Sequence, residues 1–208
     1  MNKVVRDKDV PAYWEEAKRE LIRCDRVMRR IIPCCADSML STRGDPFVTL
    51  ARSIVGQQIS VAAAQNVWER LLAAFPDFSP ARVARVRVER LRACGLSQRK
   101  SEYILDLAAH FRKGGVRNED WHSLEDEAVV AALTEISGVG RWTAEMFLIF
   151  NLMRPDVLPV DDLGLQKAVS QHYFSGDTVT RSELREVGAN WAPWRSVGTW
   201  FMWRSLNP

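Results

Sequence analysis

Residues 133–147 of the chain read LTEISGVGRWTAEMF. The apolar spacing predicts one helix that ends near Ile136 and a second that starts near Arg141. Between them the two glycines allow backbone conformations closed to other residues and leave no side chain in front of the backbone. The N–H groups that open the second helix can then bind an anion. An ordinary turn between two packed helices has the same pattern. Only the rest of the sequence can therefore distinguish an anion site from such a turn.

Outward from this stretch, apolar residues keep a helical spacing over almost the whole chain. The expected helices are 11–32, ended by Pro33, then 46–55, 61–71, short helices within 80–94, 98–111, 124–133, 163–174, one from about 183, and 193–206. Their expected caps are Asp45, Ser60, Ser97, Ser123, Asp161 or Asp162, and Thr180 or Ser182. The best strand candidate, 157–160, contains Pro159, so the sequence predicts an all-α fold.

The length of 208 residues and the 47% of hydrophobic residues allow one large helical unit, 1–208. Within it we expect a central lobe, 46–159, and a terminal lobe made of 1–45 and 160–208. A cleft between two lobes is a common place for a ligand. The net charge of +3 permits a local face for nucleic acid without demanding one.

Several classes of protein are excluded. No apolar run of about 18 residues predicts a membrane helix, and the first residues lack the apolar core of a secretory signal. The cysteines, Cys24, Cys34, Cys35 and Cys94, form no C-x-x-C pair. We therefore expect reduced thiols in a cytoplasmic protein.

Four segments together resemble the helix-hairpin-helix DNA glycosylase superfamily, most closely its alkylbase branch, 3-methyladenine DNA glycosylase II. They are RSIVGQQIS at 52–60, GLSQRKSEY at 95–103, the hairpin at about 133–150 with LPVDDLGL at 158–165, and WAPWRSV at 191–197. The resemblance covers most of the chain and implies the helix-hairpin-helix glycosylase fold in a DNA-associated prokaryotic protein. An extra N-terminal α/β lobe known in this branch is expected to be absent or reduced, because the residues before Pro46 are few and have a helical pattern. No iron–sulfur cluster is expected, because no cysteine follows Cys94.

The resemblance places the catalytic carboxylate directly before the apolar residue that opens a helix. That position is Asp162, with Asp161 as second choice. A fixed anion stabilises the positive sugar that forms when an N-glycosidic bond breaks, although either residue alone could be a simple helix cap. Bifunctional relatives carry a nucleophilic lysine where this chain has Trp142. The expected enzyme is monofunctional, uses water as nucleophile, has no lyase activity and requires no cofactor.

Alkylated purines such as 3-methyladenine and 7-methylguanine are cationic, and electron-rich ring faces attract cations. The resemblance assigns the base pocket to Trp142, Met146, Trp203 and Arg204. Met146 replaces an aromatic residue of the relatives, and Arg204 would oppose a cationic base unless it turns away. Three other tryptophans are expected in the core: Trp191, Trp194 and Trp200.

The expected partner is double-stranded DNA with an alkylated base, bound by a monomer and read after base flipping. The resemblance places Gln58, preceded by Gln57, as the wedge that fills the gap. Phosphate contacts are assigned to Gly138, Gly140, Arg141 and Thr143, with Arg52, Arg99, Lys100 and Arg195 as further neighbours. Arg195 could instead form a structural ion pair. A monovalent cation is expected at the carbonyls of Thr134, Ile136 and Val139.

Three other interpretations stay open. The chain could be a glycosylase for another damaged base, such as uracil, mispaired adenine or 8-oxoguanine. It could be a DNA-binding module that uses the hairpin without chemistry, although such a module needs neither the aspartate nor the tryptophans. It could also be a helical interaction protein, which leaves the four segments unexplained.

Overall fold

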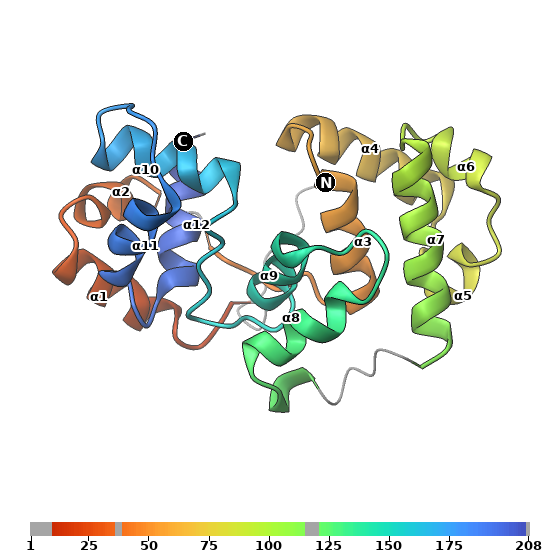
Figure 1. Cartoon of the computed structure of the whole chain (residues 1–208), viewed down its shortest axis with the longest axis horizontal. Coiled ribbons are helices and arrows are strands. Elements are labelled where there is room, and N and C mark those ends of the chain that lie inside the picture. Colours follow the sequence, from red (N-terminus) through yellow and green to blue (C-terminus); the bar gives the residue numbers. More distant parts are fainter. Residues whose placement is uncertain (1–9, 36–38, 115–120, 207–208) are drawn as a thin grey trace. The chain divides into compact units, whose positions relative to one another are not determined.

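The computed structural model describes residues 10–35, 39–114 and 121–206, and all regular structure in these ranges is helical (Figure 1). The all-α prediction is confirmed. The chain divides into two compact units. One contains residues up to Thr42 and from Met153 onward, and the other is Arg43–Leu152. The second boundary thus falls at 152/153, earlier in the chain than the expected 159/160.

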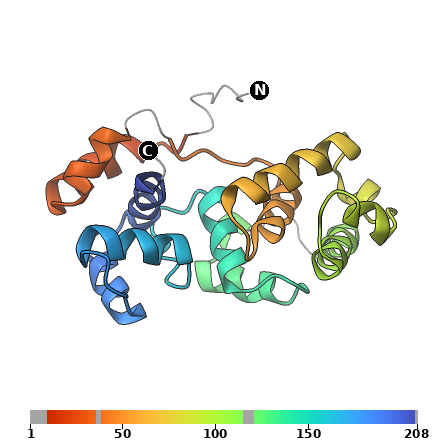
Figure 2. The same cartoon turned by 90° about the horizontal axis from the view of Figure 1, so that it is seen from above.

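The continuous unit, 43–152, is built around helix α3. Its elements are α3 (Pro46–Gly56), α4 (Val61–Ala74), α5 (Pro80–Val83), α6 (Val88–Arg92), α7 (Gln98–Arg112), the 3-10 turn η2 (Trp121–Ser123), α8 (Asp126–Thr134) and α9 (Arg141–Phe150). Helix α3 lies between α9 and α7, and Figures 1 and 2 both show this order. Its apolar face, with Phe47, Leu50 and Ile54, is at most 1% exposed. This face is what the helical spacing predicted.

Short-range capping signals set most helix starts in this unit. The side chains of Asp45, Ser60 and Ser97 each accept a backbone N–H at the start of α3, α4 and α7, as predicted. Ser123 was the wrong cap, because α8 starts at Asp126 after Glu125. The nearby Trp121 is 5% exposed and its ring packs edge-on against Phe147 with centroids 5.6 Å apart. This burial accompanies a separate 3-10 turn over 121–123.

The discontinuous unit is built around helix α12. Its helices are α1 (Trp14–Cys24), α2 (Met28–Cys34), α10 (Leu163–Tyr173), α11 (Arg181–Ala189) and α12 (Arg195–Ser205). Helix α12 contacts each of the other four (Figure 1). Thr180 caps α11 in a full capping box, as one of the two predicted caps. The last helix begins at Arg195 and not at Pro193.

The predicted helix 11–32 is broken in two at Asp25, which is a correction. Asp25 Oδ1 accepts the N–H groups of Val27 at 2.7 Å and Met28 at 2.9 Å, so its carboxylate starts a new helix. Its Oδ2 accepts the Tyr173 hydroxyl at 2.9 Å. Pro33 does not end the segment either, because α2 continues to Cys34.

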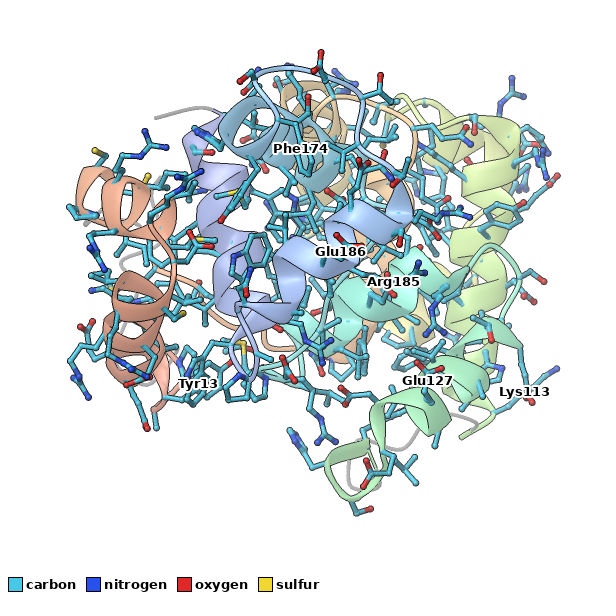
Figure 3. All side chains as sticks on the ribbon, turned by 60° about the vertical axis from the view of Figure 1, so that its left-hand side comes forward. Tyr13, Lys113, Glu127, Phe174, Arg185 and Glu186 are labelled. Carbon is cyan, nitrogen blue, oxygen red and sulfur yellow. The ribbon has the colours of Figure 1, made fainter. Side chains whose placement is uncertain are left out.

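Trp191 lies in the core of this unit, as predicted. It is 0% exposed, and its indole N–H reaches Asp25 Oδ2 at 3.3 Å. Trp194 is half-buried and stacks on Tyr13, labelled in Figure 3, with centroids 5.6 Å apart. Trp200 is also half-buried. In the described part of the chain no helix is long and apolar enough to cross a membrane.

Candidate active site

The glycine hairpin joins α8 to α9 as the sequence predicted. Helix α8 ends at Thr134, and α9 begins at Arg141 with Gly140 at the N-cap position. Gly140 has no side chain that could form a capping hydrogen bond. The turn is closed by the Val139 N–H, which donates to the Ile136 carbonyl at 3.0 Å. The start of α9 is therefore shaped for an outside acceptor, since backbone N–H groups and the helix dipole favour negative charge there.

Two features of the structure require a glycine at position 138. Its φ of +81° lies in the left-handed region. A Cβ at this position would lie 2.2 Å from Cγ of Tyr103, whose ring packs against the glycine from α7. Tyr103 received no role from the sequence, although it lies within the segment 95–103 that resembles the family. Its contact with Gly138 could not be predicted, because the two residues lie far apart in the sequence.

Two of the residues expected to bind phosphate, Thr143 and Arg141, form hydrogen bonds with other side chains of the protein. Thr143 is 1% exposed, and its Oγ1 accepts a hydrogen bond from the Gln57 amide at 3.0 Å. Arg141 is exposed and donates to Glu127 of α8 through Nη1 at 3.0 Å; Figure 3 labels Glu127. Hydrogen bonding from Arg141 lowers the pKa of Glu127. Arg141 also lies 3.4 Å from the carboxylate of Glu145.

The two wedge candidates have different surroundings. Gln58 is exposed, and its φ of +57° is unusual for a residue with a side chain. The Gln57 amide is turned onto the hairpin, where it donates to the Gly138 carbonyl at 2.8 Å. Lys100 donates to the carbonyls of Val55 at 2.8 Å and Gln57 at 2.7 Å.

In the other unit, the adjacent aspartates Asp161 and Asp162 are used differently. Asp162 caps α10 and is 8% exposed. Its Oδ1 accepts the Leu165 N–H at 2.6 Å and the indole N–H of Trp203 at 2.8 Å. Asp161 is exposed and pairs with Arg181 at 2.5 Å. Both carboxylates have hydrogen-bond partners, but only that of Asp162 is buried.

A glycine lets Trp203 come close to Asp162. A Cβ at Gly164 would lie 3.1 Å from Asp162 Oδ1 and 3.3 Å from Trp203 Cδ1. Both distances are shorter than ordinary van der Waals contact. Gly164 was quoted in the segment 158–165 but received no role from the sequence. Its contact with a residue of α12 comes from tertiary structure alone.

The expected pocket residues fall into two pairs, one in each unit. Trp142 is half-buried and Met146 is 4% exposed, both on α9. Trp203 and Arg204 are half-buried on α12. The Arg204 guanidinium lies over the ring of Trp200, 4.7 Å from its centroid, so it is held by a neighbour on the same helix.

The remaining basic candidates also have partners within the protein. Arg195 pairs with Asp156 through two hydrogen bonds of 2.6 and 2.8 Å, which confirms the structural ion pair. Arg52 donates to Gln65 at 2.8 Å, and Arg99 donates to the Tyr103 hydroxyl at 3.1 Å. Among the described residues, no group of three or more His, Cys, Asp or Glu side chains is placed to hold a metal ion.

Helices α8 and α9 are joined by a glycine turn. A later helix, α10, is capped by a buried aspartate that accepts a hydrogen bond from a tryptophan. These features define a protein of the helix-hairpin-helix class. Comparison with known families matches residues 51–193 to the HhH-GPD superfamily base excision DNA repair protein, and the chain belongs to this family. This confirms the resemblance drawn from the sequence.

Two relatives illustrate the match. DNA-3-methyladenine glycosylase 1 of Schizosaccharomyces pombe is 30% identical over 167 residues, which cover 77% of this chain and 72% of that protein. A putative DNA-3-methyladenine glycosylase of Bacillus subtilis, YfjP, is 28% identical, with 76% of this chain and 58% of that protein covered. This chain thus spans little more than half the length of the B. subtilis protein.

A solved structure shows the same fold. It is the S. pombe 3-methyladenine DNA glycosylase Mag1 in complex with abasic DNA. It superposes with a TM-score of 0.85 at 27% identity and covers 93% of this chain and 97% of that one. The predicted helix-hairpin-helix glycosylase fold is confirmed.

Proposed function

We propose that this protein is a base-excision DNA glycosylase that hydrolyses the N-glycosidic bond of alkylated purines in double-stranded DNA. The observation that carries the proposal is the buried Asp162 carboxylate at the start of α10, held by the Trp203 indole. The relatives named as 3-methyladenine DNA glycosylases support the choice of substrate.

Asp162 supplies the fixed negative charge. When the bond between base and sugar lengthens, positive charge grows on the sugar, and a preorganised anion stabilises it. Two hydrogen bonds to Oδ1 fix the orientation of the carboxylate before the substrate arrives. The helix N-terminus also favours the ionised form. With a carboxylate in this position the reaction needs neither a strong nucleophile nor a strong acid, because a cationic alkylated purine leaves readily.

Water is the proposed nucleophile. A lyase reaction needs an amine that attacks the sugar and forms a Schiff base. The position that carries that lysine in bifunctional relatives is Trp142, an indole without nucleophilic nitrogen. We propose a monofunctional, cofactor-independent reaction that leaves an abasic site and an uncut strand.

The hairpin is proposed to hold the DNA backbone and Gln58 to fill the space of the flipped base. Backbone N–H groups near Gly138 and Gly140 are the phosphate donors. The carbonyls of Thr134, Ile136 and Val139 are proposed to bind a monovalent cation, because neutral carbonyl oxygens suit such ions. In the unit that contains Asp162, Trp203 is proposed to supply aromatic surface for the base, and one copy of the chain is proposed to act on one lesion.

The test is release of base from methylated duplex DNA by the native protein, Asp162→Asn and Asp161→Asn. We expect the native protein and Asp161→Asn to free methylpurines and leave the strand uncut until alkali is added, whereas Asp162→Asn does not. If only Asp161→Asn is inactive, the catalytic residue is Asp161. If the native protein binds duplex DNA and frees no methylated base, another lesion or a binding role replaces this proposal.

A further inference from the structure

The side chain of Gln57 connects three elements of the unit 43–152. Its amide nitrogen donates to the Gly138 carbonyl at 2.8 Å and to Thr143 Oγ1 at 3.0 Å, so it reaches both the turn of the hairpin and the first turn of α9. These partners are 81 and 86 residues away in sequence. A primary amide has two N–H groups, and two acceptors are present. Gln57 is therefore bound within the protein and not extended toward a DNA gap.

The backbone of Gln57 is held as well. Lys100, at the start of α7, donates from Nζ to the carbonyls of Val55 at 2.8 Å and Gln57 at 2.7 Å. These carbonyls lie at the C-terminal end of α3, where helix carbonyls have no partner within the helix. A cation at that end also complements the helix dipole. Side chain and main chain of Gln57 are thus fixed by two different helices.

Gln58 follows directly and adopts a conformation that needs such support. Its φ of +57° lies in the left-handed region, which residues with a Cβ rarely adopt. A conformation of this kind persists when the surrounding structure determines it from several sides. The described contacts of Gln57 and Lys100 provide that determination on the N-terminal side, and the Ser60 cap of α4 provides it on the other side.

We propose that Gln57 is a positioning residue, which ties the backbone that presents Gln58 to the hairpin that grips the DNA backbone. The consequence rests on the proposed function. Because the Gln57 amide joins the loop of Gln58 to the hairpin, the residue that fills the gap stays at a fixed position relative to the groups that bind the phosphates. Lys100 is the second positioning residue of the same connection.

The first experiment does not depend on activity. Hydrogen–deuterium exchange is measured on the full chain for the native protein, Gln57→Leu, Lys100→Met and the control Gln171→Leu, an exposed glutamine on α10. In Gln57→Leu we expect faster exchange in both 56–60 and 137–143. In Lys100→Met we expect it chiefly in 56–60, and in Gln171→Leu in neither segment. Unchanged exchange in both segments of Gln57→Leu overturns the proposal.

The second experiment is a double-mutant cycle on base release, with Gln57→Leu, Gln58→Ala and the double variant in single turnover on a methylated duplex. Each single change is expected to slow release about tenfold, on the order of one or two net hydrogen bonds. The double variant should be slowed little further, because a wedge that is no longer positioned contributes nothing when removed. Losses that multiply to about a hundredfold would show independent roles and overturn the coupling.

Two further arms separate the possible failures. If Gln57→Leu does not fold, Thr143→Val removes one of the two acceptors and is expected to produce the same two exchange changes in weaker form; unchanged exchange in Thr143→Val contradicts the proposal. If the native protein releases no methylated base, the proposed function fails, and the exchange experiment alone decides whether Gln57 connects the two segments.

Discussion

Helices α9 and α10 each follow a tight loop, and their N-termini are built in opposite ways. At α9 the N-cap is Gly140, which has no side chain to cap the first turn. At α10 the N-cap is Asp162, whose carboxylate already accepts the Leu165 N–H. The same backbone dipole is present at both.

The N-cap residue, Gly140 or Asp162, therefore decides whether the helix start attracts negative or positive charge. The α9 start presents N–H groups to an anion from outside, such as a DNA phosphate. The α10 start carries its own anion and would repel a phosphate, but it attracts positive charge. The first suits binding of DNA and the second suits chemistry on a cationic sugar. The predictions below test this division, beginning with the largest effect.

Asp162→Asn should remove the chemistry and keep the helix. Asparagine caps a helix about as well as aspartate, so the melting temperature should change little. Loss of the fixed charge should slow single-turnover base release by about 10²–10³-fold. Duplex affinity measured in parallel should stay the same or rise slightly, because one negative charge is lost. A variant that melts early would show that Asp162 matters chiefly as a cap.

Gly138→Ala should damage the α9 side by distorting the turn. The added Cβ meets the Tyr103 ring at 2.2 Å and forces a left-handed φ of +81° on alanine. We expect a loss of about 2–4 kcal/mol in unfolding free energy, with a matching loss of duplex affinity. Thermal melting and fluorescence anisotropy measure the two effects.

Gly140→Ala is the matched control for that change. A Cβ at Gly140 meets nothing within 4 Å, and its φ of −91° is ordinary. Its cost in stability should be about 1 kcal/mol or less. Equal losses of stability in the two variants would contradict the role given to Tyr103 as the surface against which Gly138 packs.

Gly164→Ala should disturb the α10 side without affecting DNA binding. The new methyl group would press on Asp162 Oδ1 and the Trp203 indole, at 3.1 and 3.3 Å. We expect base release to slow by about tenfold, the effect of weakening one net hydrogen bond. Duplex affinity should stay within about twofold, so kcat and binding separate. Parallel losses in both would place Gly164 in the DNA-binding surface.

Glu127→Gln should have the smallest effect, and in the direction of gain. Glu127 and Arg141 are both exposed, and their ion pair contributes little to stability in water. The change leaves Arg141 with one less carboxylate to bind, so it is more available to a phosphate near the α9 start. We expect duplex affinity to rise by about twofold at low salt and the gain to shrink as salt increases.

The sequence predicted most helix starts because capping is local. Asp45, Ser60, Ser97 and Thr180 each bind an N–H only three residues away. The break at Asp25 could not be predicted from periodicity, because the apolar spacing continues through it. Its cause includes a hydrogen bond to Tyr173, 148 residues away.

The candidate site follows the same rule. That Asp162 caps α10 was readable from its place before Leu163, whereas its bond to Trp203 joins residues 41 apart. The family resemblance made Gln57 a wedge candidate beside Gln58. Nothing in that position showed that its amide would be bound to the hairpin. Local chemistry was predictable, and the partners that position it came from the tertiary structure.

The division of the chain also bears on the order in which its two units can fold. The unit 43–152 is continuous, so all of its residues are synthesised before α10. The other unit pairs α1 and α2 with α12, so these contacts of α1 and α2 form only after α12 has been synthesised. Domains fold as units during synthesis. The hairpin can therefore be complete on a nascent chain, whereas the Trp203 bond that holds Asp162 forms among the last.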